Sequence, residues 1–168
     1  MKVRFLIGAG LALAGLTLTG FASSPILVWN ASSSAPIGLY RIEAVRPELR
    51  SLALVQLPTD AARLASQRGY LHLTNFVLKP VAAVTGDRVC RFGASILVNG
   101  RAAATAQSSD GAGRPMPSWQ GCHRLTLAEV FLLSDPPDSF DSRYFGPVSG
   151  AQVIGRAHRL WSPPKAPH

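Results

Sequence analysis

Residues 76–84 have the sequence FVLKPVAAV, an apolar run that contains one cation, Lys79. The run is rich in valine and is bounded by the polar residues Asn75 and Thr85, a pattern typical of a strand buried in a sheet. The sequence therefore predicts a mainly β fold. Shorter apolar or alternating runs predict five more strands, over residues 38–44, 52–57, 94–98, 129–134 and 152–160.

Turn and helix signals lie between these runs. Asn99-Gly100 directly follows the third of the shorter runs and predicts a type I′ hairpin turn. Pro58-Thr59-Asp60 begins the one expected helix, Asp60–Gln67. Residues 105–120 are rich in serine, glycine and proline and predict a surface loop. The 13 prolines and 15 glycines of this 168-residue chain favour many turns over a helical bundle.

The composition fits one modest domain and excludes several classes of protein. Charged residues make up 15% of the chain, too few for a disordered polyelectrolyte. Two cysteines cannot form a disulfide-dense scaffold or a four-thiolate zinc site. The net charge is +8, but the cations are scattered singly and form no nucleic-acid motif. This charge alone fits an anionic membrane surface as well as it fits nucleic acid.

The first forty residues favour the membrane. Lys2 and Arg4 precede an apolar segment, residues 5–29, and no charge follows Arg4 until Arg41. Twenty-five residues at about 1.5 Å each exceed the hydrocarbon core of ~30 Å. The two leading cations favour a cytoplasmic N-terminus, with the rest of the chain outside. The alternative is a signal peptide that is cleaved after Ala22.

Both alternatives export the rest of the chain into an oxidising compartment. Cys90 and Cys122 are then predicted to form a disulfide, and two buried free thiols are the alternative. Closing a loop of that length would stabilise the domain by roughly 3–4 kcal/mol. The expected organisation is a cytoplasmic tip and membrane anchor over residues 1–29, an exported domain over residues 30–162, and a proline-rich tail over residues 163–168.

Lys79 is the first candidate for chemistry. The chain has three lysines, and Lys2 and Lys165 lie near its ends, whereas arginine supplies most other cations. Arginine stays protonated in proteins, but burial disfavours the charged form of a lysine and lowers its pKa. A buried Lys79 could therefore act as a general base. The alternative is a lysine that extends from a strand edge to solvent.

Two other segments carry hydroxyls and charges. Residues 30–40 (NASSSAPIGLY) place three serines before a proline, which indicates either a polar linker or a presented serine nucleophile. Residues 132–147 form an acidic turn with spare hydroxyls, in which Asp141 and Arg143 could pair. A Ser-His-Asp triad is disfavoured because there is no G-x-S-x-G motif. The histidines at 72, 123 and 158 show no metal-ligand spacing with the cysteines, so no metal or other cofactor is expected.

Taken in order, these segments resemble three motifs of bacterial signal peptidase I, and within that family its small branch, the TraF-type peptidases of conjugative transfer. Residues 30–40 are similar to the N-x-S-x-S-x-P-x-G-x-Y motif of that branch. Residues 78–89 resemble the lysine motif, in which a strand lysine precedes a Gly-Asp turn. Residues 139–146 (SFDSRYFG) resemble S-x-D-S-R-x-x-G. The resemblance implies a signal-peptidase-I-like β-fold catalytic domain on a single N-terminal transmembrane helix.

The resemblance also implies roles for individual residues. The nucleophile falls on Ser34 and the general base on Lys79. Supporting roles fall on Ser32, whose hydroxyl joins the Ser34 N–H in the oxyanion hole, on Ser139, which holds the lysine, and on Asp141 and Arg143, which brace the site. Ala35 and Pro80 depart from the general secretory enzymes, which have a methionine after the nucleophile and often a cation after the lysine. These departures favour the conjugation branch.

The function implied is that of a membrane-anchored serine endopeptidase in the bacterial inner membrane, with its catalytic domain in the periplasm. The expected partners are the lipid bilayer and a membrane-embedded protein substrate, a pilin-like subunit of a conjugation apparatus; no nucleic-acid partner is expected. The acyl-enzyme would be resolved by water or, as in some relatives, by the amino terminus of the substrate, which yields a cyclic product. The alternative is a non-enzymatic periplasmic assembly factor of a secretion or conjugation channel.

Overall fold

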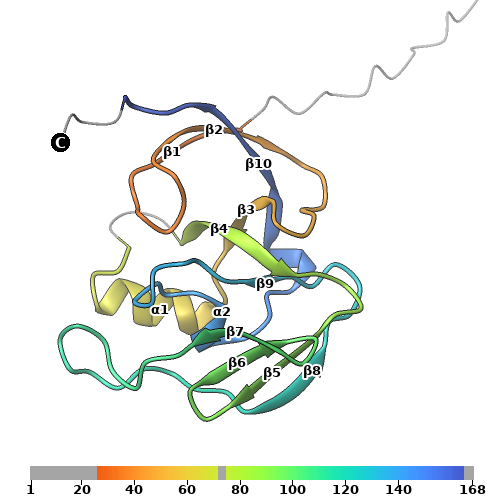
Figure 1. Cartoon of the computed structure of the whole chain (residues 1–168). Coiled ribbons are helices and arrows are strands. Elements are labelled where there is room, and N and C mark those ends of the chain that lie inside the picture. Colours follow the sequence, from red (N-terminus) through yellow and green to blue (C-terminus); the bar gives the residue numbers. More distant parts are fainter. Residues whose placement is uncertain (1–25, 72–74, 165–168) are drawn as a thin grey trace, which may run out of the picture.

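Two antiparallel sheets dominate the computed structural model, which describes residues 26–71 and 75–164 (Figure 1). The larger sheet has the strand order β1-β2-β10-β3-β4-β9, and the smaller has the order β7-β6-β5-β8. The strands of the larger sheet are β1 (Ile26–Asn30), β2 (Gly38–Glu43), β3 (Leu52–Gln56), β4 (Phe76–Ala83), β9 (Phe131–Leu132) and β10 (Val153–Trp161). Those of the smaller sheet are β5 (Arg88–Phe92), β6 (Ser95–Val98), β7 (Arg101–Thr105) and β8 (Gly121–Arg124).

The predicted mainly β fold is confirmed. Five of the six predicted strands agree with β2, β3, β4, β6 and β10 to within one residue at each end, while the run 129–134 forms only the two-residue β9. The expected helix is α1 (Thr59–Gln67), and the turn after β6 has positive φ at both Asn99 and Gly100, as a type I′ turn requires. The strands β1, β5, β7 and β8, and the one-turn helix α2 (Ser142–Phe145), were not predicted.

The last residues of the apolar segment 5–29 form a strand and not the end of the expected membrane anchor. Ile26–Asn30 forms β1 and pairs with β2 from Ile26↔Ile42 to Asn30↔Gly38. Hydropathy alone does not distinguish the apolar residues of an expected anchor from those of an adjoining strand. Residues 1–25, which hold the rest of the expected anchor, lie outside the described residues. Within the described ranges, no helix is long and apolar enough to span a bilayer.

The two faces of the larger sheet pack into different cores. On one face, Ala53, Val55, Val77 and Val81 pack in one cluster with the buried alanines of α1. On the other face, residues from β2, β3, β4 and β10 form a second cluster that includes Leu54 and Leu78. Because side chains alternate along a strand, Lys79 shares the first face with Val77 and Val81. The lysine therefore lies at the edge of the apolar cluster that packs against α1.

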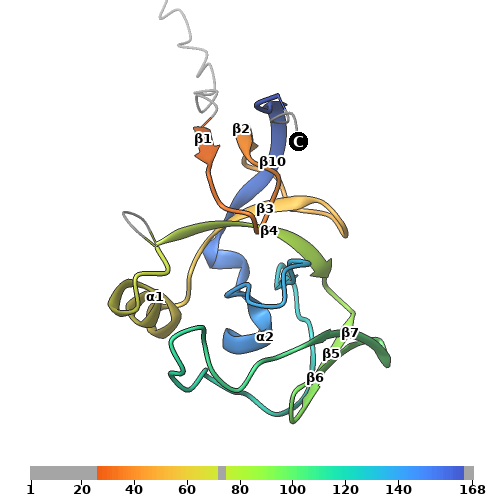
Figure 2. The same ribbon diagram turned by 60° about the vertical axis from the view of Figure 1, so that its left-hand side comes forward.

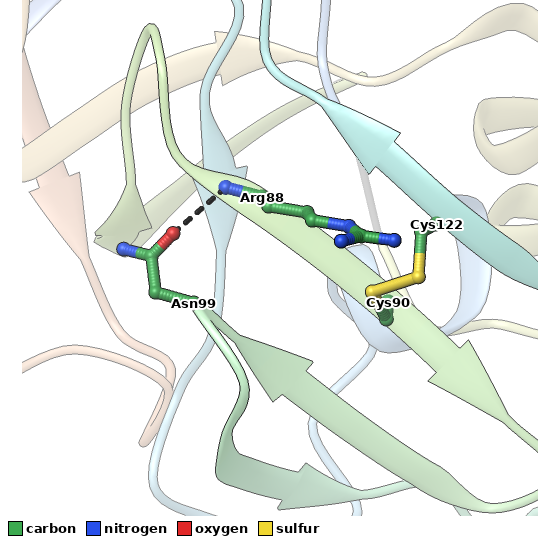
Figure 3. The surroundings of a disulfide bond; sticks show 4 residues. All are labelled: Arg88, Cys90, Asn99 and Cys122. Carbon is green, nitrogen blue, oxygen red and sulfur yellow. Dashed lines mark hydrogen bonds between the residues drawn. A yellow bond between two sulfur atoms is a disulfide. The ribbon is translucent and has the colours of Figure 1, made fainter.

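The smaller sheet lies at the opposite end of the molecule from β1 and β2, with α1, α2 and β9 between (Figures 1 and 2). A third apolar cluster joins it to the end of β4. Cys90 on β5 and Cys122 on β8 face each other in the register and form a disulfide that closes a sequence separation of 32 (Figure 3). This cross-link holds the two strands together.

Candidate active site

The segment between β1 and β2, residues 31–37, forms a tight loop that presents Ser34. Asn30, at the end of β1, organises this loop: its Nδ2 lies 3.0, 2.9 and 3.1 Å from the carbonyl oxygens of Ser32, Ala35 and Pro36. Its Oδ1 accepts hydrogen bonds from the backbone N–H and the hydroxyl of Ser32. Tyr40, fully buried in β2, adds a hydrogen bond from its hydroxyl to Pro36 O at 2.6 Å. The loop is thus fixed from both flanking strands.

Lys79 reaches this loop from β4. Its side chain is 5% exposed, and its Nζ lies 2.8 Å from Ser34 Oγ and 2.5 Å from Ser139 Oγ. The two hydroxyl oxygens are 3.3 Å apart. The structure therefore brings Lys79 together with two serines that lie 45 and 60 positions away from it in the sequence. A neutral amine in this position can accept the proton of the Ser34 hydroxyl.

The surroundings of Lys79 favour the neutral amine. Burial lowers the pKa of Lys79 from 10.5 to about 8, because desolvation penalises the ammonium. The charges of Asp141 and, more weakly, Asp138 act in the opposite direction, and the charge of Arg143 adds to the lowering. Asp141 and Arg143 carry opposite charges, so their effects on the pKa of Lys79 oppose each other, and burial remains the largest cause of the shift. An amine whose pKa lies close to neutral pH is suited to accept a proton from a hydroxyl.

A buried ion pair supports the segment that carries Ser139. Arg143 Nε lies 2.8 Å from Asp141 Oδ1 and its Nη2 lies 3.0 Å from Oδ2, a bidentate contact between side chains that are 2% and 0% exposed. Asp141 also caps α2 by accepting the Arg143 N–H, and it accepts the Ser134 N–H at 2.9 Å. Arg143 in turn donates to the carbonyl oxygens of Ser134 and Pro137. The pair thus ties both ends of the 134–143 segment together.

The Ser32 side chain, predicted to join the oxyanion hole, makes its hydrogen bond within the 31–37 loop and its flank rather than with Ser34 or Lys79. The Ser32 hydroxyl is directed at Asn30 Oδ1, 3.0 Å away. The Ser34 N–H donates to no acceptor within the described ranges, so it is available to a bound group. His123 and His158 pair instead with Glu129 and Glu43, and His72 lies outside the described residues.

Several residues that hold the site were not identified from the sequence. Asn30 and Tyr40 are part of the first motif, and that motif was the signal that could have singled them out. Arg91, 5% exposed on β5, donates from Nη1 to the carbonyl oxygen of Arg143 at 2.5 Å. Trp119 Nε1 donates to Ser142 O at 3.1 Å. Both side chains anchor α2 to the smaller sheet and its loop, and the sequence around them carries no corresponding signal.

Comparison with known proteins identifies the family to which the chain belongs. The family described as signal peptidase, peptidase S26, matches residues 2–161. The chain therefore belongs to the S26 signal peptidase family, a family of serine peptidases that act on protein substrates in membranes.

Within that family, the chain is similar to proteins of plasmid conjugation. It is 34% identical to a plasmid transfer protein TraF of Escherichia coli, over 88% of this chain and 86% of the relative. It is 32% identical to the conjugal transfer protein TraF of Agrobacterium fabrum (strain C58), over 95% of each. Among solved structures, a signal peptidase I from Enterococcus faecalis V583 aligns with a TM-score of 0.39 and 18% identity, over 68% of this chain and 98% of that one.

Proposed function

We propose that this chain is a membrane-anchored serine endopeptidase that uses a Ser34–Lys79 dyad to process an exported membrane protein in conjugative transfer. The observation that carries the proposal is the Lys79 amine, which lies 2.8 Å from Ser34 Oγ while its side chain is 5% exposed. Membership of the S26 family supports the peptidase activity. The TraF names of the relatives support a role in conjugation.

In the acylation step, Ser34 is the nucleophile and Lys79 is the general base. Neutral Lys79 Nζ accepts the proton of Ser34 Oγ while Oγ bonds to the scissile carbonyl carbon and the carbonyl electron pair moves onto its oxygen. The unoccupied Ser34 N–H and the Ser32 hydroxyl, turned away from Asn30, donate hydrogen bonds to that oxyanion. One such donor is worth about 10²–10³ in kcat. The Lys79 ammonium then protonates the leaving amine, the C–N bond breaks, and an acyl-enzyme remains.

Deacylation repeats the proton transfer with a second nucleophile. Lys79, neutral again, accepts a proton from the attacking group as that group bonds to the acyl carbon and Ser34 Oγ leaves, recovering its proton. Water gives a linear product. The amino terminus of the substrate gives a cyclic product, which is lighter than the linear one by one water. The substrate we propose is a pilin-like membrane subunit.

The position of the loop supports a membrane-embedded substrate. Apolar side chains at the start of β1 and the end of β10 are about half exposed; they are Ile26, Leu27, Trp29, Leu160 and Trp161. The rings of the two tryptophans lie 5.8 Å apart, and exposed tryptophan is typical of the membrane interface. Four residues separate Trp29 from Ser34. We therefore place the nucleophile near the periplasmic surface of the inner membrane, with the N-terminus cytoplasmic and the anchor ending before β1.

The domain organisation follows from the same placement. The proposed anchor and tip take residues 1–25, the proposed catalytic domain takes residues 26–162, and the proposed tail takes residues 163–168. The two serines before Ser34 and the one cation of β4 allow a matched set of variants to test the whole proposal.

The test is the intact mass of pilin-like membrane subunits from cells that carry the wild-type chain or one of three variants. The wild type and Ser33→Ala, a neighbouring exposed serine, should give the same processed mass. Ser34→Ala and Lys79→Arg should both leave the precursor, since the guanidinium of arginine does not deprotonate. Processing by Ser34→Ala at the normal rate would refute the peptidase and favour an assembly factor.

A further inference from the structure

The strand β9 pairs with β4 (Figure 1), and Ser134 lies two residues beyond the end of β9. The register pairs Val81 with Leu132, and Leu133 N donates to Pro80 O at 3.1 Å. This hydrogen bond makes Leu133 the partner of Pro80. The next pair in the same register is Lys79 with Ser134, which places Ser134 opposite the lysine. Residues directly opposite in an antiparallel pair place their Cβ atoms on one face, about 4.5–5.5 Å apart. Ser134 and the lysine therefore share a face of the sheet.

The apolar residues two positions from Lys79 and Ser134 also place these two side chains on one face of the sheet. Val81 and Leu132 both belong to the core cluster that packs against α1. Lys79 and Ser134 lie two residues from these along their own segments, and a period of two keeps a side chain on the same face. Leu78, one residue from the lysine, packs in the other cluster. Both hydrophilic side chains thus point into the core on the α1 side.

The hydroxyl of Ser134 is unusual. Ser134 is 4% exposed, and within the described ranges its Oγ is the one buried side-chain polar atom without a hydrogen-bond partner. Its backbone N–H and C=O are both occupied, by Asp141 and Arg143. A buried hydroxyl without a partner costs free energy, so its presence beside the lysine calls for a reason.

The reaction creates a need for an acceptor at this place. The two acceptors of Lys79 are the hydroxyls of Ser34 and Ser139. An ammonium has three N–H donors. When Lys79 takes the proton of Ser34, a third N–H forms on Nζ, and Ser34 Oγ becomes bonded to the acyl carbon at the same time. The cation then has one donor more than the two hydroxyls accept.

We propose that Ser134 is a positioning residue for the general base: the N–H of the Lys79 ammonium that is directed at neither Ser34 nor Ser139 donates to one bridging water, which in turn donates to the Ser134 hydroxyl oxygen. The proposal rests on the proposed function only for the step at which the ammonium forms. The charged groups that face Lys79 are Asp138, Asp141 and Arg143, all from one segment. The strands β3 and β9 and the 31–37 loop carry no titratable group, and the Asp60 and Arg63 side chains of α1 are exposed and pair with each other. Ser134 is therefore a neutral contributor that can be changed alone.

The titration of Lys79 tests the proposal without any substrate. The full chain is labelled with ¹³C at Cε of lysine and studied by NMR in detergent. With three lysines in the chain, the Lys2→Arg and Lys165→Arg variants assign the signals. The wild-type midpoint should lie near pH 8. Ser134→Ala should move it to lower pH, with proton binding about fivefold weaker, because the ammonium loses an acceptor. Ser134→Thr, which keeps the hydroxyl, should titrate near the wild type.

Ser142→Ala is the matched control. Ser142 is also buried in this segment, but its hydroxyl accepts the Leu132 N–H and has no contact with the lysine. This variant should lose stability and keep the wild-type titration. If Ser134→Ala titrates like the wild type or at higher pH, the proposal is overturned, and a gain in stability alone would show that the hydroxyl is only an unsatisfied group. If the midpoint shifts but the wild type cleaves no pilin-like subunit, the proposed function fails, while the interaction of Ser134 with the Lys79 ammonium stands.

Discussion

The rate of acylation should depend on pH through the lysine alone. With its pKa at about 8, Lys79 is about one-tenth neutral at pH 7 and about nine-tenths neutral at pH 9. Since only the neutral amine accepts the proton of Ser34, kcat/KM for acylation should rise about tenfold between these two pH values and level off above pH 9. A lysine at its ordinary pKa of 10.5 would instead give a rise of about a hundredfold over the same interval, with no plateau below pH 10.

The measurement follows release of the leaving peptide from a defined membrane-peptide substrate in detergent, quantified by mass spectrometry under single-turnover conditions. Release of the leaving peptide is used because the amino terminus that would resolve the acyl-enzyme itself titrates at about 7.7–8.0. Lys79→Arg is the control and should be inactive at every pH. A flat profile, a rise that continues to pH 10, or activity in Lys79→Arg would each refute the reasoning.

Three further predictions concern stability. Asp141→Asn should lower the free energy of unfolding by about 3–5 kcal/mol, because Arg143 stays buried without its partner, and Asp141→Asn/Arg143→Met should lower it less; urea unfolding compares the two. Lys79→Met should raise stability at pH 7 by up to about 3 kcal/mol, because the folded wild type holds a lysine with its pKa near 8 where the unfolded chain has 10.5. Wild-type stability then rises with pH between these values, so the difference should fall below about 0.5 kcal/mol at pH 10.5, as thermal unfolding at pH 7 and pH 10.5 would measure. Cys90→Ala/Cys122→Ala should lower stability by about 3–4 kcal/mol and leave the pH midpoint of cleavage unchanged.

Each stability prediction has an outcome that contradicts it. A double variant as unstable as Asp141→Asn would show that the cost does not come from an unpaired guanidinium. Equal stability of Lys79→Met and wild type at pH 7 would mean that water reaches the lysine. A shifted cleavage midpoint in the folded cysteine variant would mean that the smaller sheet acts on the dyad.

The fold was predictable where strands carry their own apolar pattern. The run that became β4 is apolar along nearly its whole length, and its length and valine content were enough to identify it. The strands β5 (RVCRF) and β8 (GCHR) are short and rich in cations, and they exist because they pair with each other, Cys90 against Cys122. Pairing between distant segments is not written in a local pattern. The strand β1 was not predicted for the opposite reason. Its apolar residues continue the apolar segment before it, so no local boundary separates the two.

The site was predictable in part. Lys79 could be singled out because a lone lysine in an apolar strand is unusual, although the sequence left open whether it is buried or extends to solvent. Its meeting with Ser34 depends on the packing of a loop against a strand 45 residues away, and it was foreseen only through the resemblance to known motifs. The roles of Asn30 and Tyr40 were missed because both residues bind backbone carbonyls, which every residue has. The position of Ser134 opposite Lys79 depends on the register between two strands, and the sequence does not determine that register.

The contacts of Asn30 make one amide group a marker for sorting related sequences. An aspartate in its place would have almost the same size and shape, yet its carboxylate would meet the carbonyl oxygens of Ser32, Ala35 and Pro36 with no N–H to offer. Three attractive contacts would become repulsive through the exchange of one terminal group. Homologous genes that keep the serine and the lysine but encode aspartate here should thus be suspected of specifying proteins that no longer cut, and this single codon can be inspected before any protein is made.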